Sequence, residues 1–303
     1  MAGALPDTPA ARVDLPVTYS PWSGVVAIKT GGGVFSGVLI ADRYVLTAAH
    51  VASGAVENPA ALEVQFNLPE GAISISASRV DVFPGYSFPY DDLALIQLSS
   101  DAPGSAKRYT VLDTTVVPAT VMKLVGYGAS GNGDTGTTLG SNPAVRRVGE
   151  NALDVMQSAM DKSGRSSTFY LYDFDGPTGQ GSMGGGTLGN TRESMVAVGD
   201  SGSPAFISRN NQYLLMGINN FAADFSGGTT ATTYKFGNGG GGMCLSDPRF
   251  ISWLRQKSDN TMRTSSDAET TSKLPVPVWA GALVSSGFLV ALRIRKRRQS
   301  PRS

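Results

Sequence analysis

Short apolar runs separated by turn residues recur along most of the chain. They read GVVAIKT, FSGVLIAD, RYVLTAA, LEVQFNL, ISISASRVDVF, DLALIQL, VMKLVGYG and YLLMGINNF. Each run has the length of a strand and is rich in β-branched residues, and we interpret the glycine-rich stretches 181–189 and 237–242 as loops. The pattern predicts an all-β protein, built as a sandwich or as closed barrels.

One segment has a helical pattern instead. Residues 247–257, DPRFISWLRQK, begin with Asp247 as a candidate N-cap and Pro248 at the first helical position. Phe250 and Leu254 then fall on one apolar face at helical spacing. We therefore predict a helix at the C-terminal end of the β domain.

The composition changes abruptly after Lys257. Residues 258–275 are polar and have no hydrophobic period, which predicts a flexible linker. Residues 276–292, VPVWAGALVSSGFLVAL, contain no charge, and RIRKRR follows at 293–298. A helix of that length spans roughly 25 Å against about 30 Å of hydrocarbon, so we predict a single transmembrane-like tail helix with its basic end on the cytoplasmic side. A buried core helix, or nucleic-acid contact by the basic run, is the alternative.

These changes in pattern predict four parts of the chain. Residues 1–19 form an N-terminal extension, 20–257 the β domain, 258–275 the linker, and 276–303 the hydrophobic segment with its basic end. The opening residues MAGALPDTPAARVDLP lack the basic and long apolar stretches of a signal peptide. An exported protein would therefore need a start upstream of Met1, and the alternative is a body that stays in the cytoplasm.

Composition and charge exclude several classes of function. The net charge is +1, but eight of the 25 Lys and Arg residues lie after residue 257, with only three of the 24 acids. The body is therefore mildly acidic, which argues against a nucleic-acid-binding face on it. Cys244 is the only cysteine, which excludes an internal disulfide, and one cysteine with one histidine cannot supply a zinc site. The acids of YLYDFDG (170–176) suit a calcium loop or, more commonly, turn caps.

The only histidine of the chain, His50, is a candidate general base. It lies in YVLTAAHVASG, and a nucleophilic serine needs such a base of near-neutral pKa. The base in turn needs a buried carboxylate to fix its tautomer. In PYDDLALIQL, Asp92 directly precedes an apolar strand that would carry its side chain inward, whereas Asp91 is expected to face outward. A turn cap is the alternative for this acidic pair.

A candidate nucleophile, Ser201, lies in VGDSGSPAF. Gly199 and Gly202 flank it, so the chain can turn tightly and direct backbone N–H groups into one small space. The N–H groups of Gly199 and Ser201 would then form an oxyanion hole. Because GDSG also occurs in ordinary turns, the motif carries weight only together with His50 and Asp92.

The order His50, Asp92, Ser201, within LTAAH, DLALI and GDSGSP, resembles that of the trypsin-like, chymotrypsin-fold serine proteases. The resemblance covers about residues 20 to 257, where SPWSGVVAI is similar to the first strand of the family and LVGYGASGNGDTG to the start of its second half. It implies two six-stranded antiparallel barrels with the active site between them. It also implies a serine endopeptidase that acts on protein or peptide substrates and needs no cofactor.

Some departures from the family bear on specificity. Met195 stands where members that cut after Arg or Lys place an acid. The stretch LLMGINNFA is similar to the strand that lines the substrate cleft, with Asn220, Phe221 and Ala222 in place of the usual Ser, Trp and Gly. An apolar pocket cannot neutralise a guanidinium, and burying that group unpaired is costly. We therefore expect small or apolar residues before the scissile bond.

Other departures concern the loop at His50 and activation. Ser36 and Val51 replace the cysteine pair that flanks the histidine in the family, so packing must hold this loop. Family members often bury a newly cut amino terminus against the acid that precedes the serine, which here is Asp200. No typical activation sequence precedes Pro21, which leaves the partner of Asp200 open.

The tail LPVPVWAG, with its apolar run and terminal arginines, is similar to the Pro-containing carboxyl-terminal sorting signals of Gram-negative bacteria that exosortases recognise. This resemblance implies a sorting enzyme as a partner, membrane contact through 276–292, and an exported, membrane-anchored or cell-surface protein. A plain membrane anchor is the alternative. For the whole protein, two other functions stay open: a catalytically inactive binding or surface protein of the same fold, and an esterase that uses the same three residues.

Overall fold

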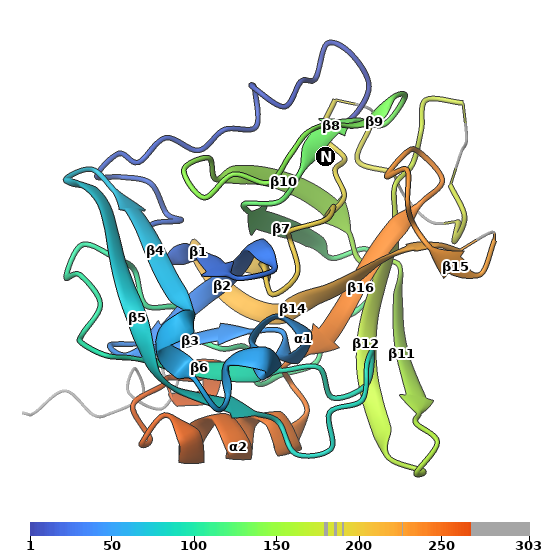
Figure 1. The fold of residues 1–303 in the computed structure, drawn as a ribbon. Coiled ribbons are helices and arrows are strands. Elements are labelled where there is room, and N and C mark those ends of the chain that lie inside the picture. The colour runs from blue at the N-terminus through green and yellow to red at the C-terminus, as the bar shows by residue number, and fades with distance from the viewer. Residues whose placement is uncertain (179–180, 185–186, 190, 226, 268–303) are drawn as a thin grey trace, which may run out of the picture. The chain divides into compact units, whose positions relative to one another are not determined.

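The computed structural model describes residues 1–267 except 179–180, 185–186, 190 and 226. The compact unit runs Met1–Ser265, and strands dominate it (Figure 1). Its helical elements are α1 (Ala49–Ala52), the 3-10 turns η1 (Ser53–Ala55) and η2 (Pro59–Ala61), and α2 (Pro248–Lys257).

The N-terminal half forms a closed barrel of six strands, as the sequence predicts. Its strands are β1 (Val25–Thr30), β2 (Gly33–Ala41), β3 (Tyr44–Thr47), β4 (Glu63–Leu68), β5 (Gly71–Val82) and β6 (Ala94–Leu98). They close in the order β1, β2, β3, β6, β5, β4. β3 is buried at every position and β6 at all but one, because the apolar runs RYVLTAA and DLALIQL supply them. This pair of strands leads into the site.

The C-terminal half is an eight-stranded sheet with a separate hairpin. The sheet contains β7 (Val121–Gly126), β10 (Arg147–Ala152), β11 (Val155–Met160), β12 (Ser166–Asp173), β13 (Pro204–Arg209), β14 (Gln212–Asp224), β15 (Thr229–Thr230) and β16 (Gly239–Cys244). Its path runs β10, β7, β13, β14, β16, β12, β11, and β15 pairs with β14. The hairpin joins β8 (Ser130–Asn132) to β9 (Gly136–Leu139).

The sheet does not by itself show the second closed six-stranded barrel that the resemblance implies, and that barrel stays a prediction. Among the described strands, β10 pairs only with β7, and β11 pairs only with β12. Two residues connect β10 to β11. The N–H of Leu153 donates to the carbonyl of Thr120, and the N–H of Asp154 donates to that of Leu171. The chain therefore passes at this point from pairing with β7 to pairing with β12.

The glycine run at 237–242, expected to be a loop, contributes most of a buried strand. All six residues of β16 are buried, and β16 lies between β12 and β14. A Cβ atom on Gly242 would lie 1.8 Å from the carbonyl oxygen of Ile218, and one on Gly240 would lie 2.5 Å from the hydroxyl of Tyr172. The glycines therefore allow a close approach that larger residues would prevent.

The predicted terminal helix is confirmed as α2. The side chain of Asp247 caps it by accepting the N–H of Arg249 at 2.9 Å. Phe250 and Trp253 pack edge-on against Phe83 of the N-terminal half, with ring centroids 4.8 and 5.3 Å apart. The end of the domain thus packs under the first barrel (Figure 1).

Both ends of the described chain pair with the β domain, although their sequences predict a separate extension and a flexible linker. Within the expected extension at 1–19, Ala2 forms a bridge with Asn132, and Val13 forms one with Arg147. Residues 258–265 were expected to begin a flexible linker, but they belong to the compact unit. The reason is a backbone ladder, in which Val111 donates to the carbonyl of Arg263 and accepts the N–H of Ser265.

No helix within residues 1–267, leaving aside the stated gaps, has the length and apolar character needed to cross a membrane. The predicted membrane segment at 276–292 and its basic end lie outside the described residues.

Candidate active site

His50 and Asp92 are brought together by one strand ladder. β3 ends at Thr47 and β6 begins at Ala94, and these two residues are antiparallel partners. The chain that leaves β3 into α1 and the chain that enters β6 therefore meet at the same end of the barrel. The Nδ1 atom of His50 lies 2.7 Å from Oδ2 of Asp92, and the backbone N–H of His50 donates to Oδ1 at 2.9 Å. Both carboxylate oxygens thus hold the histidine.

The Asp92 carboxylate is enclosed in the interior. Asp92 is fully buried, and its backbone carbonyl accepts Nδ2 of Asn220 at 2.6 Å. The other amide atom of Asn220, Oδ1, accepts the N–H of Met243 at 2.9 Å. Burial, together with the charge of Asp92, raises the pKa of Tyr86 to about 12. A buried carboxylate at this distance favours a proton on Nδ1 of His50, which leaves Nε2 as the proton acceptor.

Asp91 also turns inward, which corrects the expectation that it faces solvent. Only 1% of Asp91 is exposed. Its Oδ1 accepts the hydroxyl of Ser167 at 2.8 Å and pairs with Arg249 at 3.2 Å. The prediction assumed that successive side chains alternate between the two faces of a strand. The φ of +51° at Asp91 breaks this alternation, so the carboxylates of Asp91 and Asp92 both enter the interior, in different directions.

Ser201 lies in a tight turn that backbone hydrogen bonds hold. Gly199 and Gly202 have φ values of +91° and +80°, in the left-handed region that favours glycine. The N–H of Ser203 donates to the carbonyl of Asp200 at 2.9 Å, and the N–H of Gly202 donates to that of Asn219 at 2.8 Å. Ser201 itself stays partly exposed.

Ser36, which sequence reasoning treated only as a missing cysteine, orients the peptide group at Gly199. Its Oγ donates to the Gly199 carbonyl at 3.1 Å and accepts the N–H of Tyr127 at 3.0 Å. Its own N–H donates to the carbonyl of Ser201 at 3.0 Å. In the part of the chain that the structure describes, the N–H groups of Gly199 and Ser201 donate to no protein acceptor. The turn thus keeps two N–H donors available.

One cleft joins the two halves of the site. A cavity of about 260 Å³ is lined by His50, Phe88, Val196, Ala197, Val198, Asp200, Ser201, Asn219, Asn220, Phe221, Ala222, Thr230 and Tyr234. His50 and Ser201 therefore face the same space, and the ring of Phe88 lies edge-on to His50 with centroids 5.5 Å apart. Apolar side chains form most of the wall. Among the described residues that line the cavity, Asp200 is the only acid, and its carboxylate accepts the N–H groups of Gly128 and Ala197 at 2.8 and 3.0 Å.

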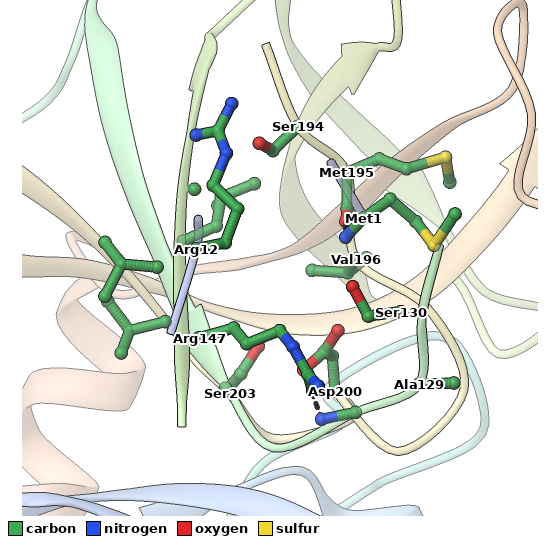
Figure 2. A pocket seen from close by; sticks show the side chains of 16 residues that line it. Met1, Arg12, Ala129, Ser130, Arg147, Ser194, Met195, Val196, Asp200 and Ser203 are labelled. Carbon is green, nitrogen blue, oxygen red and sulfur yellow. Dashed lines mark hydrogen bonds between the residues drawn. The ribbon is translucent and has the colours of Figure 1, made fainter. Parts of the chain in front are cut away.

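Met195 does not line this cleft, although the sequence placed it in the substrate pocket. Its side chain packs in the apolar cluster that contains Met1, and both residues line a second cavity of about 30 Å³ (Figure 2). The Met1 amino group donates to the Met195 carbonyl at 2.6 Å. Burial lowers the pKa of this amino group to about 6, although the charge of Asp200 opposes the shift. Asp200 thus lies between the cleft and the cavity that holds Met1.

Three carboxylates gather away from the cleft. Oxygens of Asp173, Asp175 and Glu193 lie within 4.8 Å of one another. Burial raises the pKa of Glu193 to about 7, and burial with the charge of Asp173 also raises the pKa of Asp175. The N–H of Ser182 donates to Asp173 at 2.5 Å, which compensates part of this charge. Asp173 and Asp175 are the acids of the stretch 170–176, whose calcium alternative stays a prediction.

This protein has a trypsin-like fold, as indicated by the closed barrel, the serine between two glycines and the cleft that His50 and Ser201 share. The chain belongs to the trypsin family, because the family model described as Trypsin matches residues 14–236. The resemblance on which the sequence prediction rested is confirmed over this range.

A relative from Aedes aegypti is named an inactive CLIP domain-containing serine protease A3. It is 28% identical over 211 residues, which cover 65% of this chain and 42% of the relative. The chain thus spans less than half the length of that protein. Membership of the trypsin family supports a serine protease. Because this relative is named inactive, the catalytic activity of the present protein needs a direct test.

Proposed function

We propose that this protein is a serine endopeptidase that hydrolyses peptide bonds through Ser201, His50 and Asp92. The observation that carries the proposal is the 2.7 Å contact between Nδ1 of His50 and the buried Asp92, with His50 and Ser201 on one cleft. The two available N–H groups at Gly199 and Ser201 support it further. The site needs no cofactor for this chemistry.

In the proposed mechanism, Oγ of Ser201 attacks the scissile carbonyl while Nε2 of His50 takes the hydroxyl proton. The carbonyl oxygen becomes an oxyanion, which accepts the N–H groups of Gly199 and Ser201. His50 then gives its proton to the leaving amine as the C–N bond breaks. Water attacks the acyl-enzyme in the same way and releases the acid. Asp92 stabilises the imidazolium and keeps its orientation throughout.

The first test is labelling of the purified protein by a fluorophosphonate probe, which reacts with an activated serine. We expect labelling that disappears in Ser201→Ala and in His50→Ala, because both the nucleophile and its base are then lost. Ser203→Ala, two positions away in the same turn, is the matched control and should retain labelling. Labelling that survives in Ser201→Ala would contradict the proposal.

We also propose a preference for small or apolar residues before the scissile bond. Val196, Ala197 and Phe221 give the cleft an apolar wall. Two backbone N–H groups already bond Asp200, the one acid among the described residues of the lining. A guanidinium in this cleft would therefore lose its hydration without a carboxylate partner. Cleavage of a peptide library should occur mainly after residues such as Ala, Val or Leu. Cleavage mainly after Arg would refute this preference.

A catalytically inactive binding protein is the second candidate, and the name of the Aedes aegypti relative favours it. Such a protein would keep the fold and the cleft without an activated serine. The same labelling experiment separates the candidates, since a folded protein that takes no probe would support the binding function.

We propose further that 276–292 anchors the protein in a membrane and that the tail resembling sorting signals directs it to the cell surface of a Gram-negative bacterium. An uncharged segment followed at once by RIRKRR supports this. Carbonate extraction of cells should leave the full chain with the membranes and release a chain that ends at residue 275. Release of both would refute the anchor.

A further inference from the structure

The edge of β14 nearest Ser201 is the place where a substrate backbone would add as an extra strand. β13 pairs with β14 only as far as Ile218, and residues 220–224 continue past it along the cleft. Asn220, Phe221 and Ala222 all line the cavity that contains His50 and Ser201. An extended peptide adds to such an edge by main-chain hydrogen bonds.

A segment of the protein already occupies the outer part of this edge. Ala223 pairs with Gly239 of β16 on one side and with Thr230 of β15 on the other. β15 therefore lies on the edge of β14 opposite β16, beyond the point where the pairing with β13 ends (Figure 1). The N–H of Ala231 donates to the carbonyl of Ala222 at 3.1 Å, and Ala231 is buried. We call residues 229–231 the strap.

The register of β14 decides which substrate positions the strap affects. Alternate residues of a strand direct their backbone groups to the same edge. A bulge lies between Asn219 and Phe221, and beyond it the Ala222 carbonyl points to the edge that the strap covers. Asn220, the extra residue of the bulge, lines the cavity together with Ser201. We therefore infer that an added strand would bond at Asn220 on the inner side and at Ala222 on the outer side, and the outer position is taken. A peptide whose first residue before the scissile bond pairs near Asn220 would meet the strap at its third residue.

We propose, on the basis of the serine endopeptidase function proposed above, that the strap ends substrate recognition at the second residue before the scissile bond. The third residue of a substrate gains no strand pairing, because Ala231 holds the Ala222 carbonyl that would receive its N–H. Earlier residues gain none either, because β15 already pairs with Ala223 and Asp224. Substrates are then selected through two residues on the amino side.

The test compares kcat/KM for an acetyl-dipeptide and an acetyl-tetrapeptide anilide with the same residue before the scissile bond, using the full chain. We expect the two values to agree within about twofold for the unmodified protein. Ala231→Pro removes the N–H donor and should raise the tetrapeptide-to-dipeptide ratio about tenfold, the effect of one regained hydrogen bond. Ala231→Gly keeps the donor, and its ratio should stay unchanged.

Two further arms keep the test decisive. Should Ala231→Pro fail to fold, the double variant Thr229→Gly, Thr230→Gly, at two exposed positions, weakens the strap and should raise the ratio about threefold. A tetrapeptide preference of tenfold or more in the unmodified protein, or a ratio that no strap variant changes, overturns the strap while fluorophosphonate labelling still supports the endopeptidase. Absence of labelling by the folded protein overturns both.

Discussion

Replacing Asp92 with asparagine is expected to lower kcat about 10⁴-fold while the protein stays folded. Asp92 accepts two hydrogen bonds from His50, one from the backbone N–H and one at Nδ1. An asparagine oxygen can accept only one of them. With its oxygen on the backbone N–H, its NH₂ group donates to Nδ1 and forces the histidine proton onto Nε2. The base then cannot accept the proton of Ser201.

The measurement is kcat for a peptide ester or anilide, with thermal unfolding to verify the fold. Asp91→Asn is the matched control, because it makes the same chemical change at a neighbouring residue that is also buried. Asparagine tolerates the φ of +51° at Asp91, so only the pairing with Arg249 weakens and kcat should fall by less than about tenfold. Equal losses in the two variants would mean that Asp92 acts only through the fold.

The candidate site was largely predictable, because its signals are local. His50 is the only histidine, Ser201 lies between glycines whose positive φ values the structure contains, and Asp92 precedes a buried strand. The structure brings His50 and Asp92 into contact and places His50 and Ser201 on one cleft. Their catalytic roles stay predictions until activity is measured.

The parts that sequence reasoning missed depend on contacts between distant segments. The glycines of β16 look like a loop in sequence, but Gly242 is needed where the chain approaches Ile218 too closely for a Cβ atom. Ser36 bonds Gly199 across 163 positions of the chain, so no local pattern reveals it. The backbone bond between Ala231 and Ala222, which closes part of the cleft edge, involves no side-chain signal at all.

The arrangement of the second sheet has a similar cause. The hydrophobic pattern marks the strands of both halves, but it does not fix their number or their partners. In the first barrel β1 pairs with β4 and closes the ring, whereas in the second half β10 pairs with β7 and β11 with β12 on either side of Leu153 and Asp154. Such pairing depends on backbone bonds between distant segments rather than on the hydrophobic pattern.

Gly202→Ala is expected to destabilise the protein by about 4 kcal/mol and to lower Tm by roughly 10 °C. Gly202 has a φ of +80°, which strains any residue with a Cβ atom. That atom would also lie 2.0 Å from Oγ1 of Thr47 and 2.3 Å from the carbonyl oxygen of Ser36. Thr47 donates its hydroxyl to the same Ser36 carbonyl at 2.9 Å, so neither neighbour can move without breaking a buried hydrogen bond.

Thermal unfolding followed by circular dichroism measures this effect, and fluorophosphonate labelling well below the new Tm measures its local consequence. Labelling should fall strongly even in the folded variant, because Ser36 bonds the carbonyl groups of Gly199 and Ser201. A shift of Ser36 would therefore move the two residues whose N–H groups form the proposed oxyanion hole. Gly54→Ala is the matched control, since Gly54 is exposed and a Cβ atom there has no neighbour within 4 Å. Its Tm should change by less than about 2 °C. If the Gly202→Ala protein were as stable as the Gly54→Ala protein, Thr47 and Ser36 would be able to move away from the added Cβ atom at little cost. The turn at Ser201 would then not have the rigid conformation that the proposed chemistry requires.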